Sequence, residues 1–268
     1  MEFTDSQLII HLFNNIDVFL AVFARMIGFF IVVPALSSTN MPPQTRIALA
    51  LGVAIIAFVG NIVQLPPYNP SLASFGVLLI QEFAIGLVIA LVVNIMFTMF
   101  HFVGQLVDFQ MGFGMVNVFD PFTNTQTPIT GNFYFLIISL LFVLTGSLQT
   151  VLGLMFGSFY HIGLGQGYVF GNASLAAEFV DIIIHYFYLG FRIAMPAIGT
   201  IMIVNIILGI MVKSVPQMNV FVVGMPIKVL IGLTLMFLTM PFLISAFEMV
   251  LVFIVESVAR VIGGMAGG

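Results

Sequence analysis

The amino-acid sequence predicts an all-α, polytopic integral membrane protein of about six long apolar helices arranged as hairpins, some of them kinked. Hydrophobic residues make up 61% of the 268 residues and charged residues 6%, with a mean hydropathy of +1.23. No single soluble core of this size could bury so much apolar surface. In addition, six apolar stretches recur along the chain, and they approach or exceed the roughly 20 residues that a spanning helix requires.

Short connections join the six stretches, which predicts one membrane domain over residues 1–268. In order, the stretches are Ile16 to Leu36, Ile47 to Val63, Phe75 to Val103, Phe133 to Phe156, Phe179 to Val212 and Ile227 to Ile262. Turn signals rich in Pro, Gly, Asn and Ser separate them, among them SSTNMPPQ, QLPPYNPS, SFYHIGLGQGYVFGNAS and KSVPQMNVFVVGMP. The third, fifth and sixth stretches exceed one perpendicular span, so we expect tilt, kinks or extension beyond the bilayer. Pro196 and Pro241 are the expected kinks.

The composition and motifs exclude several functional classes. The 6 basic and 10 acidic side chains give a formal net charge of −4, which is not the basic footprint of a nucleic-acid-binding protein. The chain contains no HExxH, GxSxG or Gly-rich phosphate loop, and its four histidines are scattered without metal-ligand spacing. We therefore expect no enzyme, no catalytic residue, no metal site and no cofactor. The expected surroundings are membrane lipid.

The clearest ionisable residues inside the apolar stretches are Arg25, Glu82, Arg192 and Glu248. A charge in apolar surroundings is costly, so each is expected to face a partner or a water-filled cavity. Three alternatives are open at this point. The residues could pair with one another, for example Glu82 with Arg192, and so hold the bundle together. Arg25 and Glu82 could instead lie near helix ends and reach the interface, or the group could form a proton- or substrate-coupling site.

The stretch from Val103 to Gly131 is unusually apolar for a connection between two membrane helices. Its first half is rich in Phe, Met, Val and Gly, and Asp108 and Asp120 are its two charged residues. Backbone outside a helix cannot face lipid, because its N–H and C=O groups would lack partners. We therefore expect an irregular plug loop that is covered by protein or lines a cavity. An ordinary buried loop that packs against its own helices is the alternative.

Two separated motifs resemble one family. The run VGQLVDFQMGFGMVNVFDPFTNTQTPITGNFY resembles that of the flagellar biosynthesis protein FliR family, which includes the T component (SctT) of virulence-associated type III secretion. The run KSVPQMNVFVVGMPIK resembles a second motif of the same family, in the expected order, and the six-stretch layout extends the similarity over the chain. Two positions depart from the family pattern. Thr145 to Leu148 replaces a frequent Gly-His, and Lys213 replaces an Arg, which keeps the charge but loses the planar fork.

The resemblance implies a component of the type III secretion export gate in the bacterial inner membrane, at the flagellar basal body. Its implied partners are FliP-type and FliQ-type subunits, with which it would form a closed channel for unfolded flagellar export substrates. Residues 1–177 would be a P-like part with the plug loop at 103–131, and residues 178–268 a Q-like helical hairpin. The rival interpretations are a stand-alone secondary transporter or ion channel, and a scaffold without a gating role.

The resemblance also implies roles for two groups of residues. In the plug, methionines would deform around a substrate, glycines would let the backbone move, phenylalanines would exclude water, and an Asp-Pro turn would end the loop. The expected plug residues are Asp108, Phe109, Gln110, Met111, Gly112, Phe113, Gly114, Met115, Asp120 and Pro121. The tip of the Q-like hairpin would contact an FlhB-type switch protein through Lys213, Pro216, Gln217 and Asn219, unless it is a simple helix-helix turn.

Overall fold

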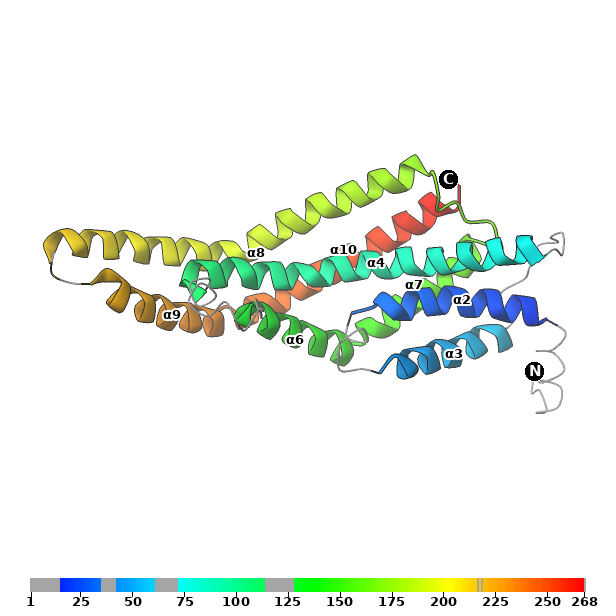
Figure 1. The fold of residues 1–268 in the computed structure, drawn as a ribbon, viewed down its shortest axis with the longest axis horizontal. Coiled ribbons are helices and arrows are strands. Elements are labelled where there is room, and N and C mark those ends of the chain that lie inside the picture. Colours follow the sequence, from blue (N-terminus) through cyan, green and yellow to red (C-terminus); the bar gives the residue numbers. More distant parts are fainter. Residues whose placement is uncertain are drawn as a thin grey trace. The chain divides into compact units, whose positions relative to one another are not determined.

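The computed structural model describes residues 15–34, 42–60, 72–113, 128–215, 217 and 219–267. These residues form eight α-helices, so the all-α prediction is confirmed (Figure 1). The helices are α2 (Ile16–Val32), α3 (Pro43–Val59), α4 (Leu72–Met111), α6 (Ile129–Leu144), α7 (Ser147–His161), α8 (Ala173–Ser214), α9 (Val220–Leu238) and α10 (Met240–Met265).

Four of these helices, α4, α8, α9 and α10, are long and apolar enough to cross a membrane. The pair α6 and α7 is bent by 69° at its break and would add a fifth span if the two helices act together. The chain is therefore a polytopic membrane protein. α4 and α8 have 40 and 42 residues, so each is about 60 Å long at 1.5 Å per residue. That length is about twice the hydrocarbon thickness of a bilayer, as the long apolar stretches predict.

Two of the predicted stretches are each divided into two helices. The fourth breaks between α6 and α7, where Gly146 has a φ of +75°, a backbone conformation that favours glycine. The sixth breaks at Thr239, between α9 and α10. Pro241 is the second residue of α10, where a missing N–H leaves no helical hydrogen bond unmade, so it starts a helix instead of kinking one. Pro196 lies inside α8, where the kink expected there stays a prediction.

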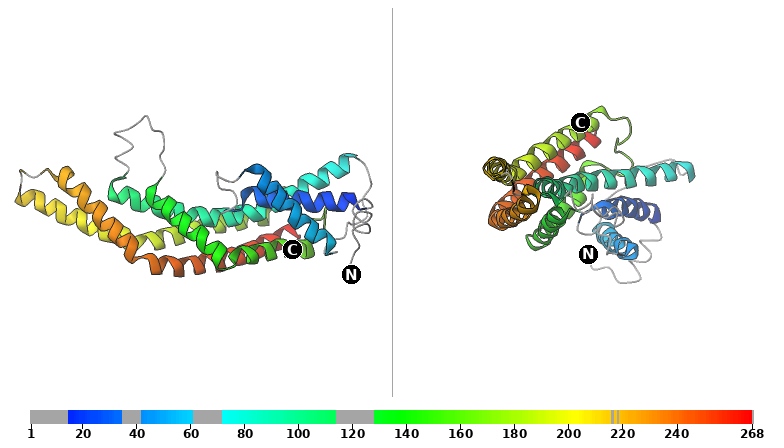
Figure 2. Two further views of the ribbon diagram at one scale, coloured as in Figure 1. Left: turned by 90° about the horizontal axis from the view of Figure 1, so that it is seen from below. Right: turned by 60° about the vertical axis from the view of Figure 1, so that its left-hand side comes forward.

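The chain divides into two compact units, each made of segments that are far apart in the sequence. The first unit comprises residues 1–95, 146–182 and 252–268. In it, α2 and α3 lie side by side (Figure 2). α2 also packs closely on the first half of α4, because a methyl group added to Gly28 or to Gly86 would overlap the backbone of the other helix. Small residues of this kind let membrane helices approach to backbone contact.

The second unit comprises residues 96–145 and 183–251. It contains the last part of α4, α6, most of α8, α9 and the first half of α10; α8 and α9 lie side by side as a hairpin (Figures 1 and 2). Aromatic side chains fill much of its interior; for example, the rings of Phe97 and Phe142 meet edge to face with centroids 4.8 Å apart.

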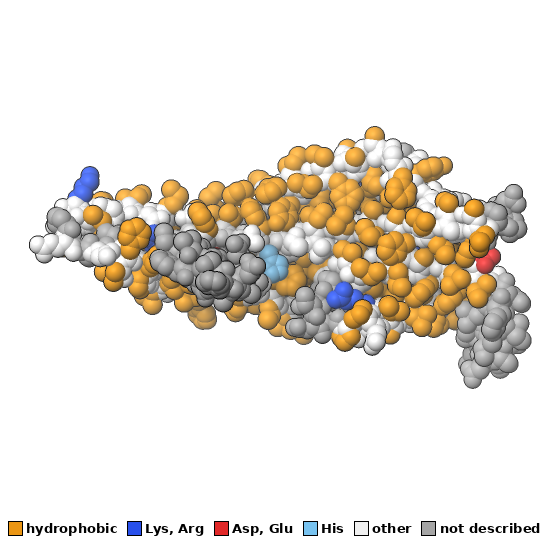
Figure 3. Space-filling model, viewed as in Figure 1, with side chains coloured by type: hydrophobic (Ala, Val, Ile, Leu, Met, Phe, Trp, Pro, Cys, Tyr) orange, Lys and Arg blue, Asp and Glu red, His pale blue; other side chains and the backbone are white. Residues whose placement is uncertain are grey.

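Hydrophobic side chains also cover most of the molecular face seen in Figure 3. Exposed apolar surface of this extent suits lipid or a partner subunit.

Candidate functional site: the α4–α6 junction

The predicted plug loop begins later than expected, because α4 continues through Val103 as far as Met111. Val103, Val107 and Met111 recur every four residues and are all buried, so the apolar composition of this segment is that of a helix face. Gly112, with a φ of +88°, then ends the helix, and its N–H donates to the carbonyl of Phe109 over 3.2 Å. The prediction of an irregular loop from Val103 onward is therefore wrong for the segment up to Met111.

The residues on either side of this connection form what we call the α4–α6 junction: Gly104, Asp108, Met111 and Gly112 on the α4 side, and Thr130 and Gly131 on the α6 side. Residues 114–127 lie between them and outside the described residues, and four of the expected plug residues belong to this stretch. These are Gly114, Met115, Asp120 and Pro121.

A polar contact from α4 caps the start of α6. Pro128 precedes α6 and supplies no side-chain cap, so the first N–H groups of α6 need an acceptor from elsewhere. The carboxylate of Asp108 accepts the N–H of Thr130, at 3.1 Å from Oδ2 and 3.3 Å from Oδ1, and it also accepts the Thr130 hydroxyl. Asp108 is only 6% exposed. An acidic side chain here also interacts favourably with the positive end of the helix dipole.

A steric contact reinforces this cap one turn earlier on α4. A methyl group added to Gly104 would overlap the backbone of Gly131 and lie 2.7 Å from the carbonyl carbon of Thr130. Only a residue without a side chain lets the two helices cross this closely. The junction is thus held by one hydrogen-bonded group and one glycine contact, both within the second unit.

Met111 fixes the end of α4 in the interior of the second unit. Its side chain is fully buried and packs in a cluster with Val107, Ala197 and Ile201. It also lies directly against Gly232 of α9, where an added methyl group would overlap the methionine sulfur. The neighbouring plug residues differ from it. Phe113 is partly buried against the same cluster, Gln110 is also partly buried, and Phe109 is 76% exposed.

The first unit contains a second buried polar group, which we call the Arg25 cluster: Arg25, Glu82, Ser158, Ile162 and Gly165. Arg25 and Glu82 are fully buried, and Nε of Arg25 lies 2.6 Å from Oε2 of Glu82. Glu82 therefore pairs with Arg25 and not with Arg192, and both residues are buried away from the ends of their helices. Arg25 also donates to the Ser158 hydroxyl over 3.1 Å and to the Ile162 carbonyl over 3.2 Å.

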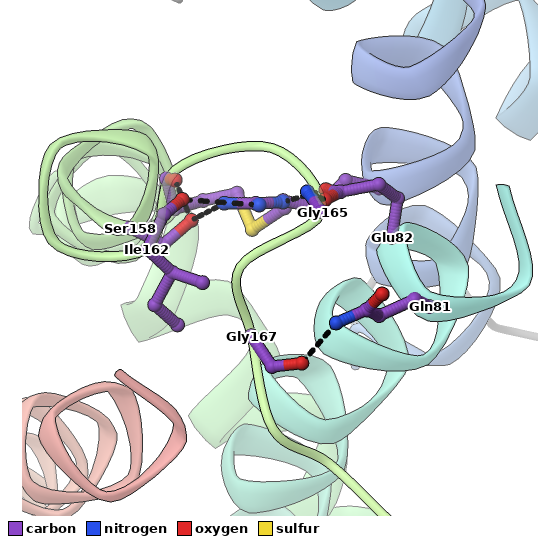
Figure 4. Close-up of polar contacts among 8 residues, drawn as sticks. Gln81, Glu82, Ser158, Ile162, Gly165 and Gly167 are labelled. Carbon is purple, nitrogen blue, oxygen red and sulfur yellow. Dashed lines mark hydrogen bonds and ion pairs between the residues drawn. The ribbon is translucent and has the colours of Figure 1, made fainter. Parts of the chain in front are cut away.

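The Arg25 cluster holds the segment that follows α7. The second carboxylate oxygen of Glu82 accepts the N–H of Gly165 over 2.8 Å, and Gln81 beside it donates to the carbonyl of Gly167 (Figure 4). Gly165 has a φ of +74°. Sequence reasoning singled out Arg25 and Glu82 but missed Ser158, Ile162 and Gly165, since two of these contribute only backbone groups.

Comparison with known protein families places both sites within one matched segment. The profile of the family described as "Bacterial export proteins, family 1" matches residues 16–253. The chain belongs to this family. It is 30% identical to the flagellar biosynthetic protein FliR of Bacillus subtilis (strain 168) over 223 residues, which are 83% of this chain and 85% of the relative.

Other members of the bacterial export family match over similar lengths. The chain is 25% identical to the flagellar biosynthetic protein FliR of Escherichia coli (strain K12) over 219 residues, with 81% and 82% of the two chains covered. It is also 25% identical to the surface presentation of antigens protein SpaR of Shigella sonnei over 230 residues, with 84% and 88% covered. Both sites lie within the segment that the family profile matches.

The remaining predicted site residues of this bacterial export family member are mostly exposed. Arg192 on α8 and Glu248 on α10 are exposed, so they do not line an interior cavity of the described chain. Lys213 and Gln217 are exposed near the tip of the α8–α9 hairpin, and the side chain of Asn219 accepts the N–H of Phe221 and caps α9. Pro216 lies outside the described residues. Within the described ranges, His, Asp and Glu form no group of three that could hold a metal ion.

Proposed function

We propose that this chain is a component of the flagellar type III secretion export gate in the bacterial inner membrane, at the basal body. With FliP-type and FliQ-type subunits it forms a closed channel for unfolded flagellar export substrates, and it performs no enzymatic step. Membership of a bacterial export family supports the export role, and the names of several relatives support the flagellar branch. The anchoring of the plug at the α4–α6 junction is the observation that carries the gating role.

The junction supports a plug because it secures both sides of one short connection. On the α4 side, Met111 is buried and Gly112 turns the chain out of the helix. On the α6 side, Thr130 and Gly131 are held to α4 by Asp108 and Gly104. A segment that changes conformation while staying in the channel needs ends that are fixed to the surrounding helices. In this proposal Gly112 is the pivot, and Gly114, Met115, Asp120 and Pro121, which lie outside the described residues, are the remaining expected plug residues.

Partner subunits are proposed because the described chain leaves much apolar surface uncovered. α8 and α9 carry many exposed large hydrophobic side chains, including Ile203, Ile206, Leu230 and Phe237. α8 is about twice as long as the bilayer core is thick, so lipid alone cannot cover this surface. We assign residues 1–177 to a P-like part and 178–268 to a Q-like hairpin. The exposed Lys213 and Gln217 are the contacts we propose for an FlhB-type switch protein.

A stand-alone secondary transporter or ion channel is the alternative, and the buried charges argue against it. A transporter commonly places ionisable groups at a site near the bilayer midplane that substrate or coupling ions can reach. Here Arg25 and Glu82 are sealed in the first unit and bonded to each other and to protein groups. Arg192 and Glu248 are exposed.

Co-purification tests the proposed assembly. The chain would be expressed with and without FliP-type and FliQ-type subunits, and the mass of each purified particle would be measured. The proposal expects one mixed particle, with the chain unstable when it is expressed alone. A stable, monodisperse particle of this chain alone would contradict the assembly and favour the transporter.

The gating role needs a separate test. Gly112→Val introduces a β-branched side chain at a φ of +88° and should distort the exit from α4, so we expect ion leakage or blocked export. Gly153→Val is the matched control, since an added methyl group at this exposed position in α7 has no neighbour within 4 Å. Unchanged ion conductance and export in the Gly112 variant, with the complex intact, would leave only a scaffold role.

A further inference from the structure

Asp108 is a buried carboxylate whose hydrogen-bond donors are all neutral. Both of its oxygens are bonded to Thr130, through the backbone N–H and the hydroxyl. Among the described residues, no Lys, Arg or His forms an ion pair with it. A carboxylate buried without a cation is unusual, because its charge has lost much of its hydration and gained no opposite charge. The positive end of the α6 dipole and the donors of Thr130 are what stabilise the ionised form.

The ionisable groups around Asp108 do not supply a counter-charge. On α6, Tyr134 is buried one turn beyond Thr130, and its hydroxyl bonds to Thr239. On α4, His101 lies about two turns before Asp108, with its ring stacked on Phe135 at 4.4 Å. The other described charged residues of the second unit lie elsewhere on α8, α9 and α10. They are Arg192, Lys213, Lys228 and Glu248, none of which contacts Asp108.

We infer that Asp108 is a proton-binding site and that its protonation loosens the α4–α6 junction. One proton adds to a carboxylate oxygen, and the two bonds from Thr130 then lose their charge assistance, which makes up about half of their strength. The interaction with the helix dipole is lost as well. Burial of the neutral acid is less costly than burial of the carboxylate. The cap of α6 is thus strong when Asp108 is ionised and weak when Asp108 is protonated.

Hydrogen exchange on the intact chain tests this inference. The protection of the amides of residues 129–134 would be measured between pH 5 and pH 8 and corrected for intrinsic exchange with amides of α7. We expect protection to fall about five- to tenfold as the pH is lowered, which is the effect of losing a helix cap. Asp108→Asn keeps the shape of the side chain but cannot ionise, so it should show the weak, low-pH protection throughout the range.

The control is Asp181→Asn, which neutralises an exposed aspartate of the first unit and should leave the pH dependence at α6 unchanged. Protection of α6 that is independent of pH in the natural chain, or pH dependence that survives Asp108→Asn, would overturn the inference. If Asp108→Asn fails to fold, the carboxyl infrared band of Asp108 in the natural chain replaces it as the readout. That band must then titrate together with the amide protection.

The inference concerns the junction and does not depend on the proposed export gate. Hydrogen exchange needs no export assay. It is measured on the purified complex, or on the chain alone if no complex forms, so failure of co-purification leaves its outcome intact. A pH-independent junction would likewise leave the proposed assembly untouched. If both hold, the anchoring of the plug on the α6 side depends on the local proton concentration.

Discussion

α4 carries two buried carboxylates that the protein treats in opposite ways. In the first unit, Glu82 is neutralised by Arg25 at 2.6 Å, and the Arg25 guanidinium also lies 4.2 Å from the centre of the Phe159 ring. In the second unit, Asp108 is stabilised only by Thr130 and the end of a helix. One helix can thus pair a buried carboxylate with a cation at one point and leave another carboxylate without a cation.

The two arrangements suit different mechanical tasks. Three hydrogen bonds tie the Arg25–Glu82 pair to α7 and the segment after it. Removing either charged partner leaves a buried charge without its counter-charge. The α4–α6 junction depends on neutral donors in the first turn of α6 and on the contact between Gly104 and Gly131. It can therefore weaken without stranding a charge, provided that the charge itself can be neutralised.

The largest effect is expected from Arg25→Met, which leaves Glu82 buried without its cation. Loss of one partner from a buried ion pair costs about 3–5 kcal/mol. We expect a large drop in thermal stability of the purified protein or complex. The double variant Arg25→Met/Glu82→Gln removes both charges and should recover much of the loss. Equal stability of the single and double variants would show that the two charges are not coupled.

The next effect is expected from Gly104→Ala. The added methyl group would overlap the backbone of Gly131, and overpacking of this kind costs about 1–3 kcal/mol. Gly76→Ala is the matched control in the same helix, where the methyl group meets open space. That control should be neutral or gain up to about 1 kcal/mol, because alanine is the better helix former. Equal melting temperatures for the two variants would contradict the close crossing of α4 and α6.

Gly104 and Gly112 show why the α4–α6 junction is only partly predictable from the sequence. The hydrophobic pattern was enough to predict the all-α class and the long helices, because composition and periodicity are local properties. Gly104 and Gly112 look alike in the sequence, yet the first serves a helix crossing and the second ends the helix. Only the position of α6 distinguishes them, so the sequence alone predicts a loop that begins at Val103.

The partners of the buried charges were hidden for a related reason. Arg25 and Glu82 stand out because charges are rare in this chain, but their pairing spans 57 residues of sequence. The acceptor at Ile162 and the donor at Gly165 are backbone groups, which any residue type supplies. The role of Asp108 as a cap for α6 likewise depends on a helix that starts 21 residues later, so no local capping motif reveals it.

A smaller effect is expected from Thr130→Val, which removes the hydroxyl bonded to Asp108 but keeps the backbone N–H. The loss of one hydrogen bond of this kind should cost about 1–2 kcal/mol and increase amide exchange at the start of α6. Thr200→Val is the control, since its exposed hydroxyl bonds only to the carbonyl of Pro196 in its own helix. An equal change in both variants would show that the Asp108 contact contributes no more than a solvent-exposed bond.

The smallest effect is expected from Arg260→Ala, which removes the cation of an exposed ion-pair group. Arg260 contacts Glu178 at 2.9 Å and Asp181 at 3.3 Å, but all three side chains are partly exposed. Exposed ion pairs contribute about 0–1 kcal/mol and are screened by salt. The loss of stability should therefore be small at low salt and vanish at high salt, whereas that of Arg25→Met should persist. A salt-independent loss at Arg260 would mean that exposure does not separate the two kinds of ion pair, and the contrast with the Arg25 cluster would fail.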